Sequence, residues 1–372
     1  MKYTLVAAAC GSLLTAAPAL SQSPPPADSA TTPDTAVSVS YGAFVDSYYA
    51  YDFSRPRNFD RSYTTQAVRH NEFNVNLAFV EAKVSGPRVR GRLALQAGTS
   101  VQSNYAGEPT IGSVSGPSLS RFIQEAVAGY RITQNLWIDG GIFFSHIGME
   151  GFISRDNLTY TRSLSADYTP YYESGARLTW QANPQLTGTF VVVNGWQNIS
   201  ENNNDKAVGA RVDLAASSST TFSYYNFAGK ENAERTLRFF NGIGMKTSAI
   251  PGLTLQANGD YGMQDKPGGG RSRWYSAGVI AKVQPTPIVG VSGRLETYHD
   301  PDQVIMLTGT DAGFKGTIAS LGLYVQPLGS SRAMWRSEAR GSWTSDPVFP
   351  ARNTRGFSAH NYVAVTSLAV TF

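Results

Sequence analysis

The chain ends on VAVTSLAVTF, residues 363–372, in which two kinds of side chain alternate. Counted back from the terminal aromatic Phe372, every second residue is mostly apolar: Val370, Leu368, Thr366, Ala364 and Tyr362. The residues between them, Thr371, Ala369 and Ser367, are small or polar. A period of two places one face of a β-strand in an apolar medium and the other where hydroxyl groups are tolerated. We therefore expect the chain to end on a β-strand with one apolar face.

The same alternation recurs along the chain in segments bounded by turn residues, most clearly in RVRGRLALQAGTSV, residues 88–101. Its apolar face carries Val89, Leu93, Leu95, Ala97 and Val101, and its polar face carries Arg88, Arg90, Arg92 and Gln96. Residues 207–214, 252–263, 288–297 and 333–343 repeat the pattern, and their polar faces include Arg211, Arg294, Glu296, Arg336, Glu338 and Arg340. These strands carry charge on one face and apolar side chains on the other.

The breaks in the alternation predict sixteen strands, which indicates an all-β protein. They lie near residues 42–52, 71–83, 88–102, 121–132, 136–147, 168–181, 186–196, 206–215, 219–229, 235–247, 252–264, 272–284, 288–299, 313–326, 332–344 and 359–372. Short connections such as SGPR and ANPQ alternate with longer ones. This is typical of a transmembrane antiparallel β-barrel with short periplasmic turns and long extracellular loops. Fourteen or eighteen strands remain as alternatives.

The composition separates a membrane barrel from a soluble β-sandwich or propeller, whose strands also alternate. Those folds expose lysine and glutamate to water, whereas the polar faces here are rich in Arg, Asn, Gln and Ser. Charged residues make up only 16% of the chain, and no apolar run reaches the roughly 18 residues that a membrane helix needs. The formal net charge of +4 gives no reason to expect nucleic-acid binding.

The N-terminal region has the features of a secretory signal followed by a leader. Residues 1–21 combine Lys2, a short apolar stretch and a small-residue site, which predicts a signal peptide. Cys10 offers a lipidation site as an alternative, but the apolar stretch before it is short. Residues 22–40 are rich in Pro, Ser and Thr without a period, which indicates a flexible periplasmic leader. The barrel is then expected over residues 41–372.

Several longer stretches carry a resemblance to a known family. They include GAFVDSYYAYDFSRP, NEFNVNLAFVEA, FIQEAVAGYR, GGIFFSHIGMEGFISRDNLTYTRSL, VVVNGWQNISENNNDKAVGARV and GKENAERTLR. Together they resemble the OmpL-like putative β-barrel porin family of the bacterial outer membrane. The resemblance implies a porin-type channel among outer-membrane lipids, and it carries over no catalytic or binding residues. It also implies that Phe372 is a terminal signal for the barrel assembly machinery.

The residues for other chemistry are sparse, and we expect no enzymatic activity and no cofactor. An outer-membrane hydrolase is the rival function, but Ser145 and His146 are neighbours on a predicted strand and should point to opposite faces. HDPD, residues 299–302, and ENNND, residues 201–205, offer oxygen ligands for calcium. Asn, Asp and Pro are also the ordinary residues of outer loops, so we expect no metal.

The polar faces predict a water-filled lumen for the passive diffusion of small hydrophilic solutes. We expect Arg88, Arg90, Arg92, Gln96, Arg211, Arg294, Glu296, Arg336, Glu338 and Arg340 to line it. A barrel with a structural or adhesin role is the alternative, and bulky apolar groups in the lumen would favour it. A monomer and a homo-trimer both remain open.

The longest loop, residues 147–167, exceeds what a hairpin needs. It is expected either to fold into or over the pore, bringing Glu150, Arg155, Asp156 or Arg162 near the path, or only to cover the outer surface. We also expect a weak anion preference, because the arginines fall on three strands that neighbour one another in a closed ring. The acidic candidates Glu125, Asp139, Glu173 and Asp213 fall on other strands, which predicts one basic and one acidic side.

Overall fold

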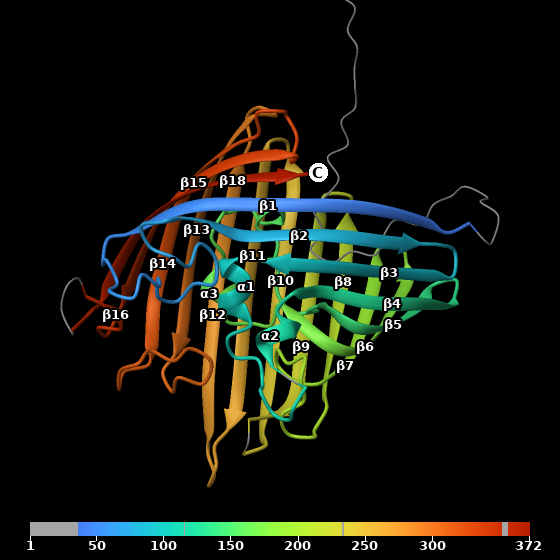
Figure 1. Ribbon diagram of the computed structural model, residues 1–372, viewed down its shortest axis with the longest axis horizontal. Helices are drawn as coiled ribbons and strands as arrows, with labels where there is room; N and C mark the ends of the chain where they lie inside the picture. Colours follow the sequence, from blue (N-terminus) through green and yellow to red (C-terminus); the bar gives the residue numbers. More distant parts are fainter. Residues whose placement is uncertain (1–35, 115, 233, 352–355) are drawn as a thin grey trace, which may run out of the picture.

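Sixteen long strands form one closed antiparallel β-barrel in the computed structural model, which describes residues 36–114, 116–232, 234–351 and 356–372. Each strand pairs with its neighbour in the chain, and the first strand pairs with the last, Phe44 opposite Thr371 and Asp52 opposite Val363. Figure 1 shows β1 to β4 crossing β8 to β13 of the opposite wall at a steep angle, as strongly tilted strands do. The predictions of sixteen strands and of closure between the first and last are confirmed.

The barrel strands follow the predicted segments closely. They are β1 (Ser38–Asp52), β2 (Phe73–Ser85), β3 (Val89–Ala97), β4 (Ile123–Thr133), β5 (Leu136–Phe144), β6 (Tyr172–Asn183), β7 (Leu186–Val193), β8 (Ala207–Ser217), β9 (Thr220–Glu231), β10 (Thr236–Ile250), β11 (Leu253–Asp265), β12 (Arg271–Val283), β13 (Val289–Asp300), β14 (Phe314–Val325), β15 (Ala333–Thr344) and β18 (His360–Thr371). A two-stranded ribbon, β16 (Phe349–Pro350) and β17 (Phe357–Ser358), and the short helices α1 (Thr99–Asn104), α2 (Pro117–Ser120), η1 (Ser154–Asp156) and α3 (Leu164–Asp167) lie in the connections.

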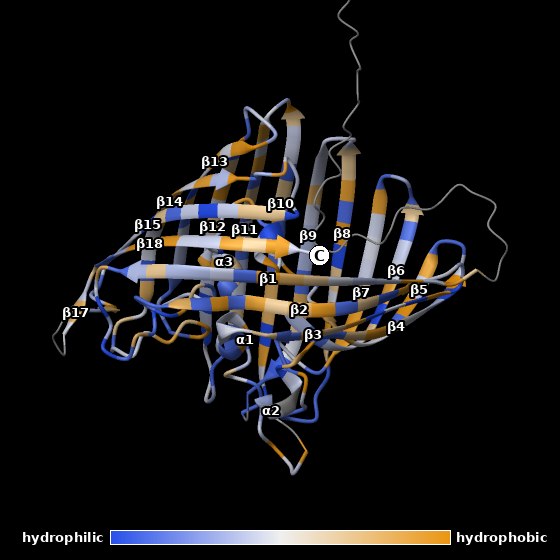
Figure 2. Ribbon diagram, turned by 45° about the horizontal axis from the view of Figure 1, so that its top comes forward, coloured by the Kyte–Doolittle hydropathy of each residue, from blue (hydrophilic) through white to orange (hydrophobic). Residues whose placement is uncertain are grey.

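Alternation along each strand decides which side chains face the lumen. In β18, Val363, Val365 and Ser367 are buried inside the barrel, whereas Tyr362 and Leu368 are exposed on the outer wall. Figure 2 shows the same alternation of hydrophobic and hydrophilic segments along the strands. An apolar outer wall suits lipid, and closure gives every strand a partner on both sides, so no sheet edge meets the hydrocarbon.

Two details of the predicted third strand are wrong. The strand ends at Ala97, and the helix α1 follows, so Val101 is buried inside the molecule and does not face an apolar exterior. Arg88 precedes β3 in the short turn after β2 and is exposed, so it does not belong to the strand's polar face. A helix is possible here because the connection from β3 to β4 is long, and its residues leave the plane of the wall.

The N-terminal part of the chain is only partly within the described residues. The first strand begins at Ser38, so the last residues of the predicted leader already belong to the barrel. The predicted signal peptide, Cys10 and most of the leader lie outside the described residues. Among the helices that the structure describes, none is long and apolar enough to cross a membrane.

Candidate functional site

The lumen is crossed by the connection between β5 and β6, residues 145–171, which we call the inner loop. Within it, Ser154, Thr161 and Arg162 are completely buried. The loop makes hydrogen bonds to Arg211 on β8 and to Arg294 on β13. These strands lie on different parts of the wall, so the loop enters the barrel and does not merely cover its outer end.

Two inward-facing glycines give the inner loop room against the wall. A Cβ atom at Gly209 on β8 would lie 2.3 Å from Nε2 of His146, and one at Gly244 on β10 would lie 2.3 Å from Sδ of Met149. Both distances are below 3.0 Å, so the side chain of His146 or Met149 would have to shift if either glycine carried a Cβ atom. The absence of side chains at these two positions therefore permits the path of the loop.

The loop begins with polar anchors to its neighbouring strands. Both Ser145 and His146 contact the carboxylate of Glu173 on β6, at 2.8 Å from Oγ and 2.9 Å from Nδ1. The other ring nitrogen, Nε2, lies 2.7 Å from the backbone oxygen of Asn226. The expectation that the two side chains point to opposite faces is wrong, since β5 ends at Phe144. Both ring nitrogens nevertheless have other partners, and no Ser–His hydrogen bond is formed among the described residues.

The middle of the loop is held by a group of charged wall residues that we call the polar clamp: Arg294 and Glu296 on β13, with Glu338 on β15. The Thr161 backbone N–H and hydroxyl both donate to Glu338, at 2.9 and 2.5 Å. The backbone N–H of Leu164, the first residue of α3, donates to Glu296 at 2.7 Å. Arg294 lies 3.2 Å from Glu296 and 3.5 Å from Glu338. The charged groups of the polar clamp are nearly inaccessible to water. They therefore hold the loop in place and do not line a water-filled path.

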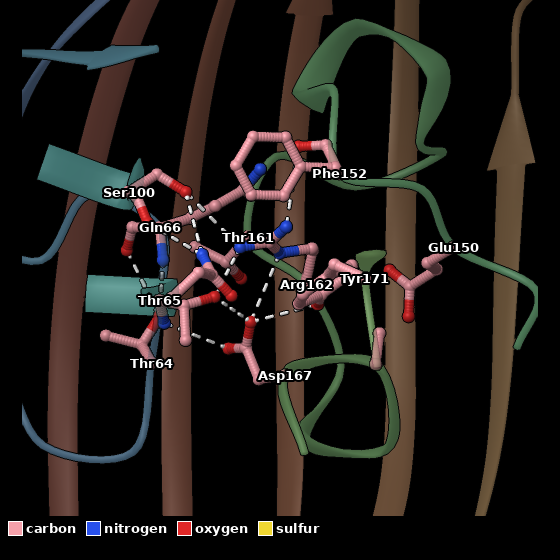
Figure 3. Close-up of polar contacts among 12 residues, drawn as sticks. Thr64, Thr65, Gln66, Ser100, Glu150, Phe152, Thr161, Arg162, Asp167 and Tyr171 are labelled. Atoms are coloured by element: carbon pink, nitrogen blue, oxygen red, sulfur yellow. Dashed lines mark hydrogen bonds and ion pairs between the residues drawn. The ribbon is translucent and has the colours of Figure 1, made fainter. Parts of the chain in front are cut away.

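Arg162 joins three separate connections, as Figure 3 shows. Its Nε donates to Asp167 at 3.1 Å, and its Nη2 donates to the hydroxyl of Thr65 in the β1–β2 loop. The same Nη2 lies 3.4 Å from Oγ of Ser100 in α1, and the guanidinium stacks 3.9 Å from the centre of the Tyr171 ring. The side chains of Arg162 and Asp167 are completely buried, so this ion pair is an internal cross-link between loops.

The loop reaches farthest toward the short-turn end of the barrel at Ser154 and Arg155. The Ser154 hydroxyl donates to Asp46 on β1 at 2.7 Å and accepts from Nη2 of Arg336 on β15 at 2.9 Å. Arg155 donates to the hydroxyl of Thr371 at the end of β18 at 2.8 Å. Arg336 therefore anchors the loop, and Arg155 with its neighbour Asp156 remains partly accessible to water.

Apolar side chains fill much of the remaining lumen on the long-loop side. Trp196 packs edge-on against Phe227 and Phe240 at 4.9 and 5.1 Å, and Trp274 joins the same cluster. A second cluster contains the stacked pair of Tyr105 and Tyr172, whose ring centres are 4.2 Å apart. The inward positions are therefore less uniformly polar than the sequence indicated.

Charged pairs lie along the wall from β2 to β8, and they correct the predicted separation of basic and acidic sides. Arg90 and Arg177 both contact Asp139, at 2.6 and 3.0 Å. Arg92 contacts Glu81 at 2.6 Å and also Glu125. On β8, Arg211 pairs with Asp213 at 2.8 Å. Arg92 on β3 reaches acids of the adjacent strands β2 and β4, and Arg90 reaches Asp139 on β5 across Gly129 of β4, which has no side chain between them.

These wall charges differ from the polar clamp in their access to water. The side chains of Arg90, Arg177 and Asp213 are 17, 20 and 29% exposed, whereas those of Arg294 and Glu338 are 0 and 1% exposed. The wall charges of β3 to β8 are therefore partly accessible to water, unlike those of the polar clamp.

Two inward lysines were not predicted. Lys282 on β12 lies 3.7 Å from the centre of the Tyr324 ring. The positive charges of Lys246 on β10 and of Arg336 are close enough to repel it. Both lysines have the strand parity of inward positions, so the alternation that identified the arginines could also have identified them. They add positive charge to the short-turn half of the lumen.

Three further residues singled out from the sequence have other surroundings. Gln96 is buried beside α1, where its Nε2 donates to Tyr105 at 3.0 Å. Glu150 accepts hydrogen bonds from the backbone and hydroxyl of Ser163, the N-cap of α3. Phe372 faces outward and is 75% exposed, while its backbone N–H donates to Ala43 of β1 at 2.9 Å.

The two stretches considered for calcium use their carboxylates internally. Asp300 accepts backbone N–H groups of the residues 304–306 turn, and Asp205 pairs with Arg235 at 2.6 Å. The hydrogen bond from Arg235 lowers the pKa of Asp205. No group of three or more His, Cys, Asp or Glu side chains suited to a metal occurs in the part of the chain that the structure describes.

The comparisons with known proteins agree with this architecture. The family described as "Putative beta-barrel porin-2, OmpL-like" matches residues 38–372. No curated protein matches the sequence. Among solved structures, the outer membrane channel DcaP of Acinetobacter baumannii is similar with a TM-score of 0.60 at 12% identity, covering 90% of this chain and 97% of that one.

Two other solved structures share the fold at similarly low identity. The anion-selective porin from Comamonas acidovorans has a TM-score of 0.60 at 11% identity, covering 91% of this chain and 100% of its own. A trimer form of OmpT, an outer membrane protein of Vibrio cholerae, has a TM-score of 0.54 at 8% identity, with coverage of 91 and 100%. At these identities the likeness concerns the fold alone.

Proposed function

The chain belongs to the OmpL-like putative β-barrel porin-2 family of the bacterial outer membrane, and from this premise we propose that it is a passive diffusion channel for small hydrophilic solutes. The observation that carries the proposal is the set of inward-facing, water-accessible charges on β3 to β8, beside a loop that is fixed across the lumen. These charges are paired with one another but remain partly exposed, as expected for ion pairs that line a water-filled path.

The channel needs no enzymatic step and no cofactor in this proposal. Its selectivity is a weak preference for anions, because Lys246, Lys282 and Arg336 bring positive charges close together in the short-turn half of the lumen. Fixed charges of one sign raise the local concentration of the opposite ion, and the effect weakens as salt increases.

The test is a recording from the purified protein in a planar lipid bilayer. Stepwise conductance increases are expected, with a reversal potential in a KCl gradient that is displaced slightly toward that of chloride. Protein that inserts in the folded, heat-modifiable form but gives no conductance would overturn the channel.

A barrel without transport is the second candidate, and the two aromatic clusters that fill part of the lumen favour it. The same recording separates the two, because a structural or adhesin barrel gives no steps. We also propose assembly as a homo-trimer inserted by the barrel assembly machinery; native mass spectrometry in detergent that shows only monomer would contradict the trimer.

A further inference from the structure

A small cavity lies where the β1–β2 loop, residues 53–72, meets the barrel wall. It is lined on the loop side by Arg61 and Thr64, and on the wall by Arg340 and Ser342 of β15 with Asn361 of β18. Its volume is about 10 Å³. A space of this size holds one water-sized occupant, and a slightly larger monatomic anion would fit only with a small outward movement of the lining side chains.

Arg61 is buried in this cavity without a carboxylate partner. Its side chain is almost inaccessible, and its Nη1 donates only to the backbone oxygens of Gln66 and Ala67, at 3.4 and 2.6 Å. Its Nε has no hydrogen-bond partner among the described residues. Asp52 attracts Arg61 but makes no ion pair with it within 4.0 Å. A buried charge in these surroundings is costly unless something compensates it.

Arg340 brings a second positive charge to the same cavity. Its Nη1 donates to the backbone oxygen of Arg162 at 3.3 Å, and its nearest carboxylate, Glu296, is 3.8 Å from Nη2. Burial lowers the pKa of Arg61, and the charge of Arg340 lowers it further, against an opposing attraction from Asp52. Two guanidinium groups therefore repel each other across a space that has room for one small occupant.

We propose that this cavity binds one monovalent anion of the size of chloride, held between Arg61 and Arg340. Water would satisfy the free N–H group of Arg61, whereas an anion would also offset the charge of Arg61 and the part of the Arg340 charge that Glu296 leaves uncompensated. The Ser342 hydroxyl also lines the cavity and can donate to the anion. Because Leu164 of the inner loop lines the cavity too, the bound anion ties the β1–β2 loop to the wall next to α3. The site does not depend on whether the barrel conducts.

Crystallography with bromide in place of chloride tests the proposal directly. An anomalous peak is expected between the guanidinium groups of Arg61 and Arg340, at full or nearly full occupancy. Density without anomalous signal at this position, in crystals grown and soaked in bromide, would identify water and overturn the site.

Heat denaturation of the folded protein in detergent provides the solution test. The wild-type midpoint is expected to rise with sodium chloride and to saturate, relative to sodium gluconate at equal ionic strength, because gluconate is too large for the cavity. Arg61→Gln should abolish this chloride dependence. The matched control Arg55→Gln removes an exposed charge from the same loop and should retain it. An equal rise in both variants would refute the site, and if Arg61→Gln does not fold, the bromide peak in the wild type decides.

Discussion

Arg294 donates from Nη1 to the backbone oxygen of Thr161 at 2.6 Å and from Nη2 to the Thr161 hydroxyl at 2.9 Å, although the two residues are 133 positions apart in the chain. The guanidinium of a wall strand thus holds the inner loop through two parallel hydrogen bonds. This geometry is specific to arginine, whose planar donors are fixed relative to one another. The inner loop is therefore an integral part of the barrel interior.

Removing Arg162 should destabilise the folded barrel. Arg162→Met leaves the Asp167 carboxylate buried without its cation, and losing one partner of a buried pair costs about 3–5 kcal/mol. The temperature at which the folded band disappears on a gel should fall. The double variant Arg162→Met with Asp167→Asn should recover part of the loss, because no uncompensated charge remains. Equal stability of the single variant and the wild type would contradict the cross-link.

Excision of residues 151–163 should raise the single-channel conductance. The segment contains Ser154 and Thr161, two of the points at which the inner loop is tied across the lumen. Deleting residues 266–270 in the β11–β12 turn is the matched control, since that turn lies outside the lumen and should leave conductance unchanged. Unchanged conductance in a correctly folded excision variant would remove the inner loop from the pathway.

Neutralising the two inward lysines should move the selectivity toward cations. Lys246→Gln with Lys282→Gln removes two fixed positive charges from the lumen, so chloride contributes less to the current and the reversal potential shifts. The shift should fade at high salt. Arg271→Gln, at the exposed outer end of β12, is the control and should have little effect. A wild-type channel that is already cation-selective would defeat the proposal.

Deletion of Phe372 should lower the amount of barrel in the outer membrane more than it lowers stability. Its ring is exposed on the outer wall, and burying such a side chain in an apolar medium is worth about 1.5–3 kcal/mol. Phe372→Trp keeps a terminal aromatic residue and should insert normally. The check is the level of heat-modifiable protein in outer-membrane fractions, and normal levels of the deletion would contradict the assembly signal.

Acidification should loosen the β1–β2 loop through His70. Its Nδ1 accepts the backbone N–H of Asp52 at 2.9 Å, so the folded loop requires a neutral imidazole nitrogen there. Burial lowers the pKa of His70. Below the unfolded value of about 6.5, the unfolded loop binds more protons than the folded one, so its stability falls as the pH drops.

Hydrogen exchange of residues 53–72 measures this effect. The protection factor, which divides out the intrinsic pH dependence of exchange, should fall between pH 7.5 and pH 5 in the wild type, and His70→Gln should show a smaller fall, because its side-chain oxygen accepts a hydrogen bond and does not titrate. The same pH response in both proteins would exclude His70.

Local patterns were sufficient for the wall of the barrel. Adjacent residues such as Ser367 and Leu368 point to opposite faces of the wall. This alternation, repeated along sixteen segments, determined which side chains face lipid and which face the lumen. In a strand, the polarity of each residue indicates which face it lies on, because successive side chains point to opposite faces. The number of strands, their antiparallel order and the closure between β1 and β18 followed from this repetition and from the alternation of short and long connections.

Only the tertiary structure decided what occupies the lumen. Thr161 binds Glu338, and Arg61 lines one cavity with Arg340, through loops that fold back into the barrel. No local periodicity encodes such arrangements. The same applies to Arg92 and Glu125, whose pairing cancels the charge separation expected from strand order. Strand geometry fixes the direction of each side chain, so the wall could be predicted from the sequence. The path of an irregular loop depends on all of its contacts with the rest of the molecule, so the interior could not be predicted.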